Sequence, residues 1–227
     1  MSTKIKVAIV EDHQSIIDGY NFRLSEPESG CEIVGVALFG EDVEMMLAES
    51  KPNVLILDAN VHSSPENPNP FPILPLVRMV LQKYPDLKIL VISMLTANAL
   101  IEALVDAGVR GYVFKDDDGS IHRLSHVIKS VAEGGAYFSP GAWEKVKPGQ
   151  SSSILTSRQM EAISLIAAYP DQSTFLLAQK LAVSDSTFRN LLSGAYKRLG
   201  VSTRAATIVR AGQLGLLVNP NEAPDLR

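Results

Sequence analysis

The sequence has only one cysteine, Cys31, among its 227 residues. A single thiol allows neither an intramolecular disulfide framework nor a four-ligand zinc site of the cysteine-rich kind, so small disulfide-stapled folds are excluded. Because Cys31 stands just before the apolar run 33–36, we expect it to be a buried small hydrophobic residue and not a reactive thiol. This cysteine usage is typical of a cytoplasmic protein.

Long apolar runs are also missing. Pro, Gly or charged residues interrupt every apolar stretch well short of the ~20 residues that a membrane-spanning helix needs. The apolar run after Lys4 and Lys6 has the length of a strand, so it does not resemble a secretory leader. The sequence further lacks the Gly-x-x-x-x-Gly-Lys-Ser/Thr and Gly-x-Gly-x-x-Gly motifs, which argues against a small nucleotide-binding α/β enzyme.

Charge is divided unevenly along the chain. Residues 1–150 contain 13 Lys and Arg against 20 Asp and Glu, whereas residues 151–227 contain 8 against 5. The front part is therefore acidic and the tail basic. This division permits contact with a nucleic acid at the C-terminal end but does not establish one.

The first part of the chain alternates short apolar runs with helical stripes. The runs, rich in Val, Ile and Leu, lie at 5–10, 33–36, 54–57, 89–92 and 112–114. Continuous apolar strands separated by helices predict a parallel sheet covered on both faces. We therefore expect residues 1–138 to form an α/β domain with a five-stranded sheet in the flavodoxin-like order. The stretch 59–72, dense in Pro and Asn, is predicted to be a long mobile loop.

After this domain the strand pattern stops. Residues 139–153 end in the polar stretch Pro148–Ser153 and are predicted to be a linker. Four helical stripes follow within 154–227, which indicates a small all-α domain, and Thr156 is placed to cap its first helix.

Polar side chains follow the apolar runs of the first domain. Glu11 and Asp12 follow the first run, Asp58 the third, Ser93 the fourth and Lys115 the fifth. In a parallel sheet the carboxyl ends of the strands line one crevice, so these side chains should meet there. Carboxylates suit Mg²⁺, a hydroxyl and an ammonium suit phosphoryl oxygens, and an Asp can be an oxygen nucleophile. Taken one at a time, each is more often an ordinary loop residue or helix cap.

The same residues carry a family resemblance. Val-Glu-Asp after the first strand, Leu-Ile-Leu-Asp58, Ile-Ser93 and Gly-Tyr-Val-Phe-Lys115 resemble a bacterial response-regulator receiver domain. The resemblance implies that Asp58 takes a phosphoryl group from a histidine kinase and that Mg²⁺ is held by Glu11, Asp12, Asp58 and the Asn60 carbonyl. It also implies a switch formed by Ser93, Tyr112 and Lys115. The alternative for Tyr112 is a strand aromatic packed on the last helix. One departure is Val61-His62, where the family usually has Met-Pro.

Residues 177–188 show the pattern of a helix, a short turn and a second helix, which Ser184 is placed to cap. In a helix-turn-helix the second helix lies in the major groove of DNA. Its polar face carries Arg189, Asn190, Ser193 and Lys197, whose side chains suit bases and phosphates. The alternative is an ordinary solvated helix face.

The stretch 155–212 resembles a LuxR-type DNA-binding domain through Ser184-Asp-Ser-Thr187 and Lys197-Arg-Leu-Gly-Val201. The segment ending at Pro140 is similar to the one that follows receivers in the NarL/FixJ family. The resemblance adds Ser184, Thr187 and Arg198 to the predicted DNA-contacting residues. Leu191 stands where the family often has His, and Gly194 lowers helix propensity within the second helix.

Together these features predict a cytoplasmic transcriptional response regulator that is not an enzyme, is phosphorylated on Asp58, and dimerises on DNA when phosphorylated. An acidic receiver packed against the basic helix would repel DNA, so phosphorylation would also release that helix. The alternative is a regulator of the same architecture that a protein or small ligand controls without phosphorylation. His122 and His126, four residues apart, are expected to be surface histidines and not metal ligands.

Overall fold

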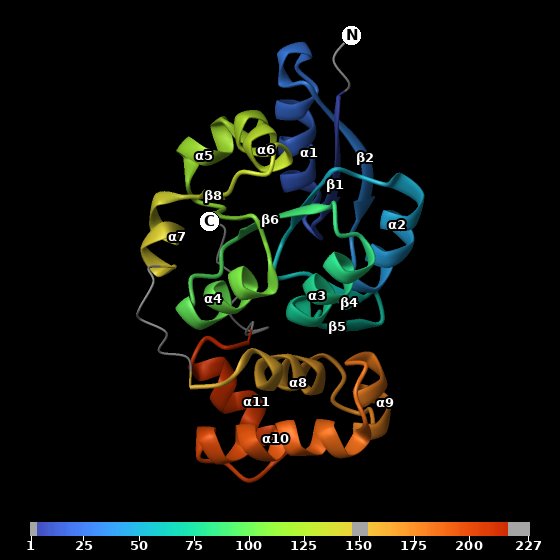
Figure 1. Cartoon of the computed structure of the whole chain (residues 1–227), viewed down its shortest axis with the longest axis vertical. Coiled ribbons are helices and arrows are strands. Elements are labelled where there is room, and N and C mark those ends of the chain that lie inside the picture. The colour runs from blue at the N-terminus through green and yellow to red at the C-terminus, as the bar shows by residue number, and fades with distance from the viewer. Residues whose placement is uncertain (1–3, 147–153, 218–227) are drawn as a thin grey trace.

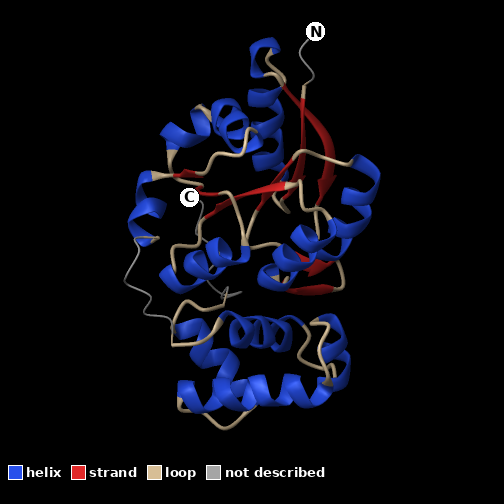
Figure 2. Cartoon of the chain, viewed as in Figure 1, coloured by secondary structure: helices blue, strands red, loops and turns tan. Residues whose placement is uncertain are grey.

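The computed structural model describes residues 4–146 and 154–217, which form an α/β domain followed by an all-helical domain (Figures 1 and 2). Its main sheet has six parallel strands in the order β2-β1-β3-β6-β7-β8. The strands are β1 (Ile5–Val10), β2 (Cys31–Ala37), β3 (Val54–Leu57), β6 (Lys88–Ser93), β7 (Gly111–Phe114) and β8 (Tyr137–Phe138). The predicted flavodoxin-like order is confirmed. The added edge strand β8 has two residues, too few for an apolar run to reveal it.

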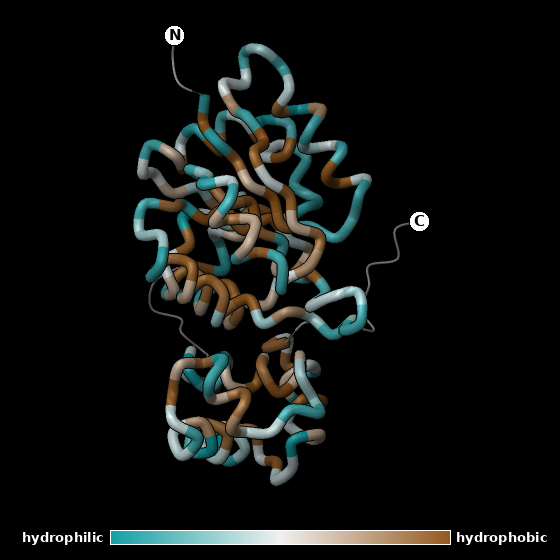
Figure 3. The backbone as a smooth tube through the Cα atoms, turned by 90° about the vertical axis from the view of Figure 1, so that its right-hand side faces the viewer, coloured by the Kyte–Doolittle hydropathy of each residue, from teal (hydrophilic) through white to brown (hydrophobic). Residues whose placement is uncertain are grey.

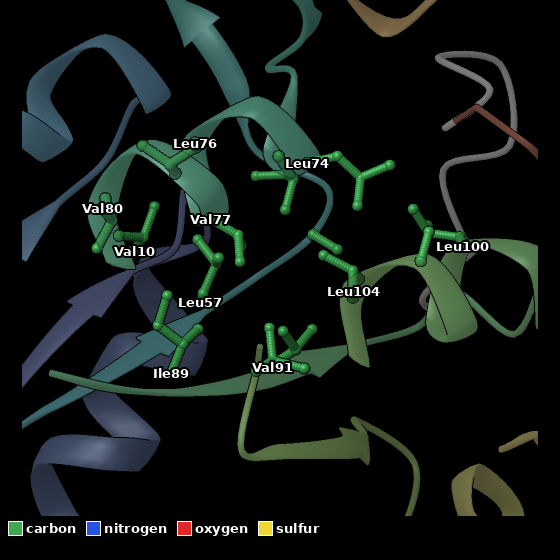
Figure 4. Packing of buried hydrophobic residues seen from close by; sticks show 14 of the residues in the cluster. Val10, Leu57, Leu74, Leu76, Val77, Val80, Ile89, Val91, Leu100 and Leu104 are labelled. Carbon is green, nitrogen blue, oxygen red and sulfur yellow. The ribbon is translucent and has the colours of Figure 1, made fainter. Parts of the chain in front are cut away.

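Helices cover both faces of this sheet. One face carries α1 (Gln14–Leu24), α5 (Asp118–His122) and α6 (Leu124–Ala132); the other carries α2 (Val43–Ser50), α3 (Ile73–Lys83) and α4 (Asn98–Ala107). Figure 4 shows Val10, Leu57, Ile89 and Val91 of the strands packed against Leu and Val side chains of α3 and α4. Figure 3 shows hydrophobic segments running through the interior of this domain. The helical segment that follows the last of the five apolar runs is divided into α5 and α6 at Arg123.

Part of the predicted linker is folded. Pro140–Lys145 form a short helix, α7, which starts with proline in its first turn. The fully buried Ser139 donates its backbone N–H to the Tyr112 carbonyl, and Ala142 is also fully buried. Because these contacts attach α7 to the α/β domain, that domain extends to about Lys145, and the rest of the predicted linker, 147–153, lies outside the described residues.

The stretch predicted to be a mobile loop is an ordered β-hairpin. Strands β4 (His62–Ser64) and β5 (Asn67–Pro70) pair antiparallel. The Ser63 hydroxyl is buried and donates to the Asn69 carbonyl at 3.0 Å, and the Phe71 amide donates to the Val61 carbonyl at 2.8 Å. The prediction was wrong because Pro and Asn marked the segment as irregular, whereas buried polar groups and the Phe71 ring fix it in place.

The C-terminal domain consists of α8 (Ser157–Ala168), α9 (Thr174–Lys180), α10 (Asp185–Leu199) and α11 (Arg204–Gln213) around the buried ring of Phe188. Thr156 caps α8 in a capping box with Gln159, as predicted for this residue. Ser184 caps α10 by accepting the Thr187 amide at 3.1 Å. Gly194 lets α8 and α10 approach, because a Cβ there would lie 2.7 Å from Nε2 of Gln159. Close packing thus explains a glycine within the second helix.

The two domains contact each other through α8. It packs against α3 and the β4–β5 hairpin, and Met160 and Ile163 join the core of the α/β domain. Arg78 on α3 pairs with the fully buried Glu161 of α8, whose carboxylate also meets Arg158. No helix among the described residues is long and apolar enough to cross a membrane.

Two glycines allow a matched test of the packing. A Cβ at Gly40 would lie 1.9 Å from Cγ of Phe71, so Gly40→Ala must displace that ring and should lower the free energy of unfolding by about 1–3 kcal/mol. At Gly19, within α1, a Cβ would meet no described atom within 4 Å, so Gly19→Ala should raise stability by about 0.5–1 kcal/mol. Urea denaturation measures both changes. Shifts of the same sign would contradict this account of the Phe71 contact.

Candidate functional site

Three acidic residues meet at the carboxyl end of the sheet. Val10 of β1 is in register with Leu57 of β3, so Glu11, Asp12 and Asp58, which follow directly, come together. We call these three residues the acidic cluster. Their side chains are 1%, 7% and 3% exposed, respectively. Such burial of carboxylates is costly unless cations or donors compensate it.

Lys115 supplies the main compensation. It follows β7, and its Nζ lies 2.7 Å from Glu11 Oε2 and 2.7 Å from Asp58 Oδ2. Burial lowers the pKa of Lys115, but the charges of Asp58 and Glu11 outweigh this effect and hold that pKa above its usual value. The lysine is therefore charged at neutral pH, and it joins two carboxylates that would otherwise repel each other.

The electrostatics of Glu11 differ from those of an ordinary surface carboxylate. Burial raises the pKa of Glu11, and the Asp58 carboxylate raises it further, while Lys115 and the His13 amide act in the opposite direction. A group held at raised pKa next to other carboxylates gains from any added positive charge. The cluster is thus prepared to receive a cation.

Two histidines, which the sequence did not single out for this site, border the cluster at Asp12. His13 Nδ1 lies 2.8 Å from Asp12 Oδ1 and 3.1 Å from Glu11 Oε1. His62, at the start of the hairpin, places Nδ1 at 2.7 Å and its backbone N at 3.3 Å from Asp12 Oδ2. His62 stands at a departure from the receiver pattern, and that was the available signal.

The donor set fits a hard divalent cation. Asp12 Oδ1 is buried and accepts no hydrogen bond among the described residues, although His13 lies close to it. Ligand atoms of Glu11, Asp12 and His13 lie within 4.8 Å of one another. Asn60 donates its backbone N–H to Asp58 Oδ1 at 3.0 Å, which brings its backbone beside the cluster. Carboxylate and carbonyl oxygens are the ligands that Mg²⁺ prefers.

The predicted switch residues lie next to the cluster. Ser93 is the last residue of β6 and is fully buried. Tyr112 is fully buried as well, and its hydroxyl donates to the Leu95 carbonyl at 2.8 Å. Burial and the Asp58 charge hold the pKa of Tyr112 above its usual value, so the hydroxyl keeps its proton. The ring packs in the core on the face of the sheet that α2, α3 and α4 cover, and not on α5 and α6 as the alternative interpretation supposed. Its hydroxyl reaches the loop after β6, which suits the switch interpretation.

The second helix of the helix-turn-helix presents its polar face outward. All seven residues predicted to contact DNA are exposed: Ser184, Thr187, Arg189, Asn190, Ser193, Lys197 and Arg198. Several of them have partners within the chain: Arg189 pairs with Asp185 one turn earlier, and Arg198 donates to the Ile154 carbonyl at 3.1 Å. The hydroxyls of Ser184 and Thr187 share a hydrogen bond at 2.8 Å.

The α/β domain does not cover this face. It contacts α8, while α10 lies at the end of the molecule farthest from the sheet (Figure 1). The arrangement considered from the sequence, in which an acidic receiver packed on the basic helix would repel DNA, is therefore not the one found in this structure. The reason is that α8 offers the apolar surface, with Met160 and Ile163, whereas the outer face of α10 is polar. His122 and His126 are exposed, as expected.

Similar proteins share the arrangement of the whole chain, although no protein-family model matches it. The transcriptional regulatory protein DegU of Brevibacillus brevis is 25% identical over 92% of this chain and 93% of its own length. DesR of Bacillus subtilis is 26% identical over 93% of this chain and 98% of its own. The structure of RcsB from Salmonella enterica serovar Typhimurium has the same fold, with a TM-score of 0.63 and 19% sequence identity. It was solved bound to the promoter rprA in the presence of the phosphomimetic BeF₃⁻, and the match covers 92% of this chain and 98% of the RcsB chain.

These relatives span both domains in the same order, so the likeness is not confined to a common sheet or a common helix pair. The strand-end residues and the helix-turn-helix occur in one chain at the places that the sequence pattern indicated. Over nearly its whole length the chain is thus similar to transcriptional response regulators, in agreement with the resemblance to the NarL/FixJ family that its sequence carries.

Proposed function

We propose that this protein is a DNA-binding response regulator whose Asp58 accepts a phosphoryl group in a reaction that requires Mg²⁺. The observation that carries the proposal is the Lys115 ammonium, which is 2.7 Å from both Glu11 and Asp58 in a buried cluster where Asp12 Oδ1 accepts no hydrogen bond among the described residues. This arrangement resembles what phosphoryl transfer needs, namely an oxygen nucleophile, a cation and donors for the equatorial oxygens.

The chemistry assigns a separate task to each group. An Asp58 carboxylate oxygen attacks phosphorus while the bond from phosphorus to the donor breaks, and the electron pair leaves with the donor, a kinase histidine or acetate. Glu11, Asp12, Asp58 and the Asn60 carbonyl would hold Mg²⁺, which neutralises charge developing on the phosphoryl oxygens. Lys115 would then move its ion pair from the Asp58 carboxylate to a phosphoryl oxygen.

The proposed switch follows from the position of Ser93. Its hydroxyl lies at the end of β6, beside β3, and could donate to a phosphoryl oxygen on Asp58. Such a bond would pull on the loop after β6, whose Leu95 carbonyl accepts the Tyr112 hydroxyl. Phosphorylation would in this way change the surface near α4, which we propose as the route to dimerisation.

DNA binding is assigned to α10. Three observations support this assignment. The polar face of α10 is exposed, residues 151–227 have a net positive charge, and RcsB structures were solved on DNA. A single helix-turn-helix reads few base pairs, so a symmetric dimer on two half-sites about one helical turn apart is expected.

The first prediction concerns Asp58. Asp58→Asn removes the nucleophilic oxygen, so acetyl phosphate with Mg²⁺ should phosphorylate the wild type but not this variant. Mass spectrometry of the intact protein measures the modification. Asp18→Asn, an exposed position on α1, is the matched control and should be modified like the wild type. Equal modification of Asp58→Asn would reject the assignment and favour control by a protein or small ligand.

The second prediction concerns the switch. Tyr112→Phe keeps the buried ring but removes the hydrogen bond to Leu95, and Ser93→Ala removes the proposed phosphoryl donor. Both variants should still be phosphorylated, but the coupling between phosphorylation and dimerisation, typically about 1–3 kcal/mol, should fall. Analytical ultracentrifugation with and without beryllofluoride measures it. Undiminished coupling in both variants would argue against this pathway.

The third prediction separates base contacts from phosphate contacts. Arg189→Ala should cost roughly 1–3 kcal/mol on the cognate duplex and little on a scrambled one. Lys197→Ala should weaken binding to both duplexes alike. It should also reduce, by about one, the magnitude of the slope of the logarithm of the binding constant against the logarithm of the salt concentration. Fluorescence anisotropy at several salt concentrations measures both variants. Equal losses on the two duplexes for Arg189→Ala would make that residue a phosphate contact.

A further inference from the structure

The β4–β5 hairpin touches both the acidic cluster and the C-terminal domain. At its base, His62 directs its backbone N–H and its ring Nδ1 to Asp12 Oδ2, at 3.3 and 2.7 Å. On its second strand, Asn67 Nδ2 and Asn69 Nδ2 both donate to the Ala168 carbonyl, at 3.0 and 3.2 Å. A segment of nine residues thus connects two places that belong to different domains.

The Ala168 carbonyl is a specific target. Ala168 is the last residue of α8, and the final carbonyls of a helix have no partner within it. Arg204 of α11 satisfies the neighbouring carbonyls of Ile166, Tyr169 and Gln172, at 3.3, 2.6 and 2.9 Å. The hairpin amides therefore complete, from the other domain, a helix C-cap that the C-terminal domain supplies only in part.

The amides are held in position for this contact. Asn69 Nδ2 also donates to Asn67 Oδ1 at 2.8 Å, and the backbone N–H of Asn67 donates to Ser64 Oγ at 3.2 Å. Phe71, just after the hairpin, lies against Gly40, and the adjacent Glu41 accepts the Tyr169 hydroxyl at 3.1 Å. Both sides of the α8 carboxyl end are therefore fastened to the α/β domain.

We propose that this hairpin is a latch, which docks the C-terminal domain through the carboxyl end of α8 and whose hold depends on what Asp12 binds. His62 contacts Asp12 Oδ2, and a cation bound at Oδ1 of the same carboxylate would draw negative charge away from that contact and repel a protonated His62 ring. A cation at Asp12 would release the base of the hairpin and weaken the hold of Asn67 and Asn69 on Ala168. The claim that the hairpin docks the C-terminal domain is independent of the proposed function, whereas the claim that a cation at Asp12 weakens this docking rests on it.

Hydrogen–deuterium exchange on the full-length protein tests the docking first, with no ligand present. In Asn67→Ala/Asn69→Ala, exchange in the facing segments 73–83 and 157–169 should rise together, roughly five- to thirty-fold, the change that one to two net hydrogen bonds correspond to. Glu66→Ala is the matched control, because Glu66 is exposed on the same hairpin and bonds Ser64 there. Arg78→Ala, which breaks the pair with Glu161, is the positive control for undocking.

The docking claim is overturned if the double Asn variant leaves both segments as protected as in the wild type while Arg78→Ala exposes them. Faster exchange confined to 61–71 would also overturn it, since the amides would then stabilise only their own hairpin.

The coupling is tested with Mg²⁺ and beryllofluoride. In the wild type, Mg²⁺ and beryllofluoride should raise the exchange rates of the hairpin and of the carboxyl end of α8. In His62→Ala, the ligand-free protein should already show these raised rates, and adding the ligands should change them little. Unraised exchange in ligand-free His62→Ala would overturn the coupling. Protection of 54–60 in the same wild-type samples reports binding itself. If 54–60 are not protected, the proposed phosphoryl site is contradicted. The exchange rates of the ligand-free variants would still show whether the hairpin docks the C-terminal domain.

Discussion

The site depends on one interaction, the ion pair of Lys115 with Glu11 and Asp58. Parallel strands bring the carboxylates of neighbouring strands to one end of the sheet, where burial and mutual repulsion oppose their charge. Lys115 arrives from β7 on the far side of β6 and joins both acids at 2.7 Å. Removing Lys115 would leave the buried carboxylates of Glu11 and Asp58 without a compensating charge. The chemistry of the site therefore depends on the strand order that brings Lys115 to both acids.

The same end of the sheet also determines where the second domain sits. His62, at the base of the hairpin, contacts Asp12, and the second strand of the hairpin contacts the carboxyl end of α8. Helix α8 packs on α3, where Arg78 pairs with the buried Glu161. The polar residues of α10 consequently stay exposed, on a helix that lies at the end of the molecule farthest from the sheet. In this arrangement α10 is not covered by the α/β domain. Under the proposed function, control of DNA binding would therefore act through the hold of the receiver on the helix-turn-helix and not through uncovering α10.

The sequence predicted most of the site because its residues follow recognisable strands. The apolar runs located Glu11, Asp12, Asp58, Ser93 and Lys115, and cap chemistry located Thr156 and Ser184. It did not predict the hairpin, α7 or β8. Each of these is short and has little periodicity of its own, and each is stabilised by contacts with residues distant in the chain, as Ser139 with Tyr112 shows.

The sequence by itself determined the two domains, the strand order and the groups at the strand ends, because apolar periodicity and turn residues are local signals. Only the tertiary structure decided how His62 meets Asp12, how Asn67 and Asn69 complete the cap of α8, and which face of the C-terminal domain is covered. Those contacts join residues about 50 and 100 positions apart. No local pattern encodes such a contact, because it exists only once both partners have folded and the buried polar groups have found each other.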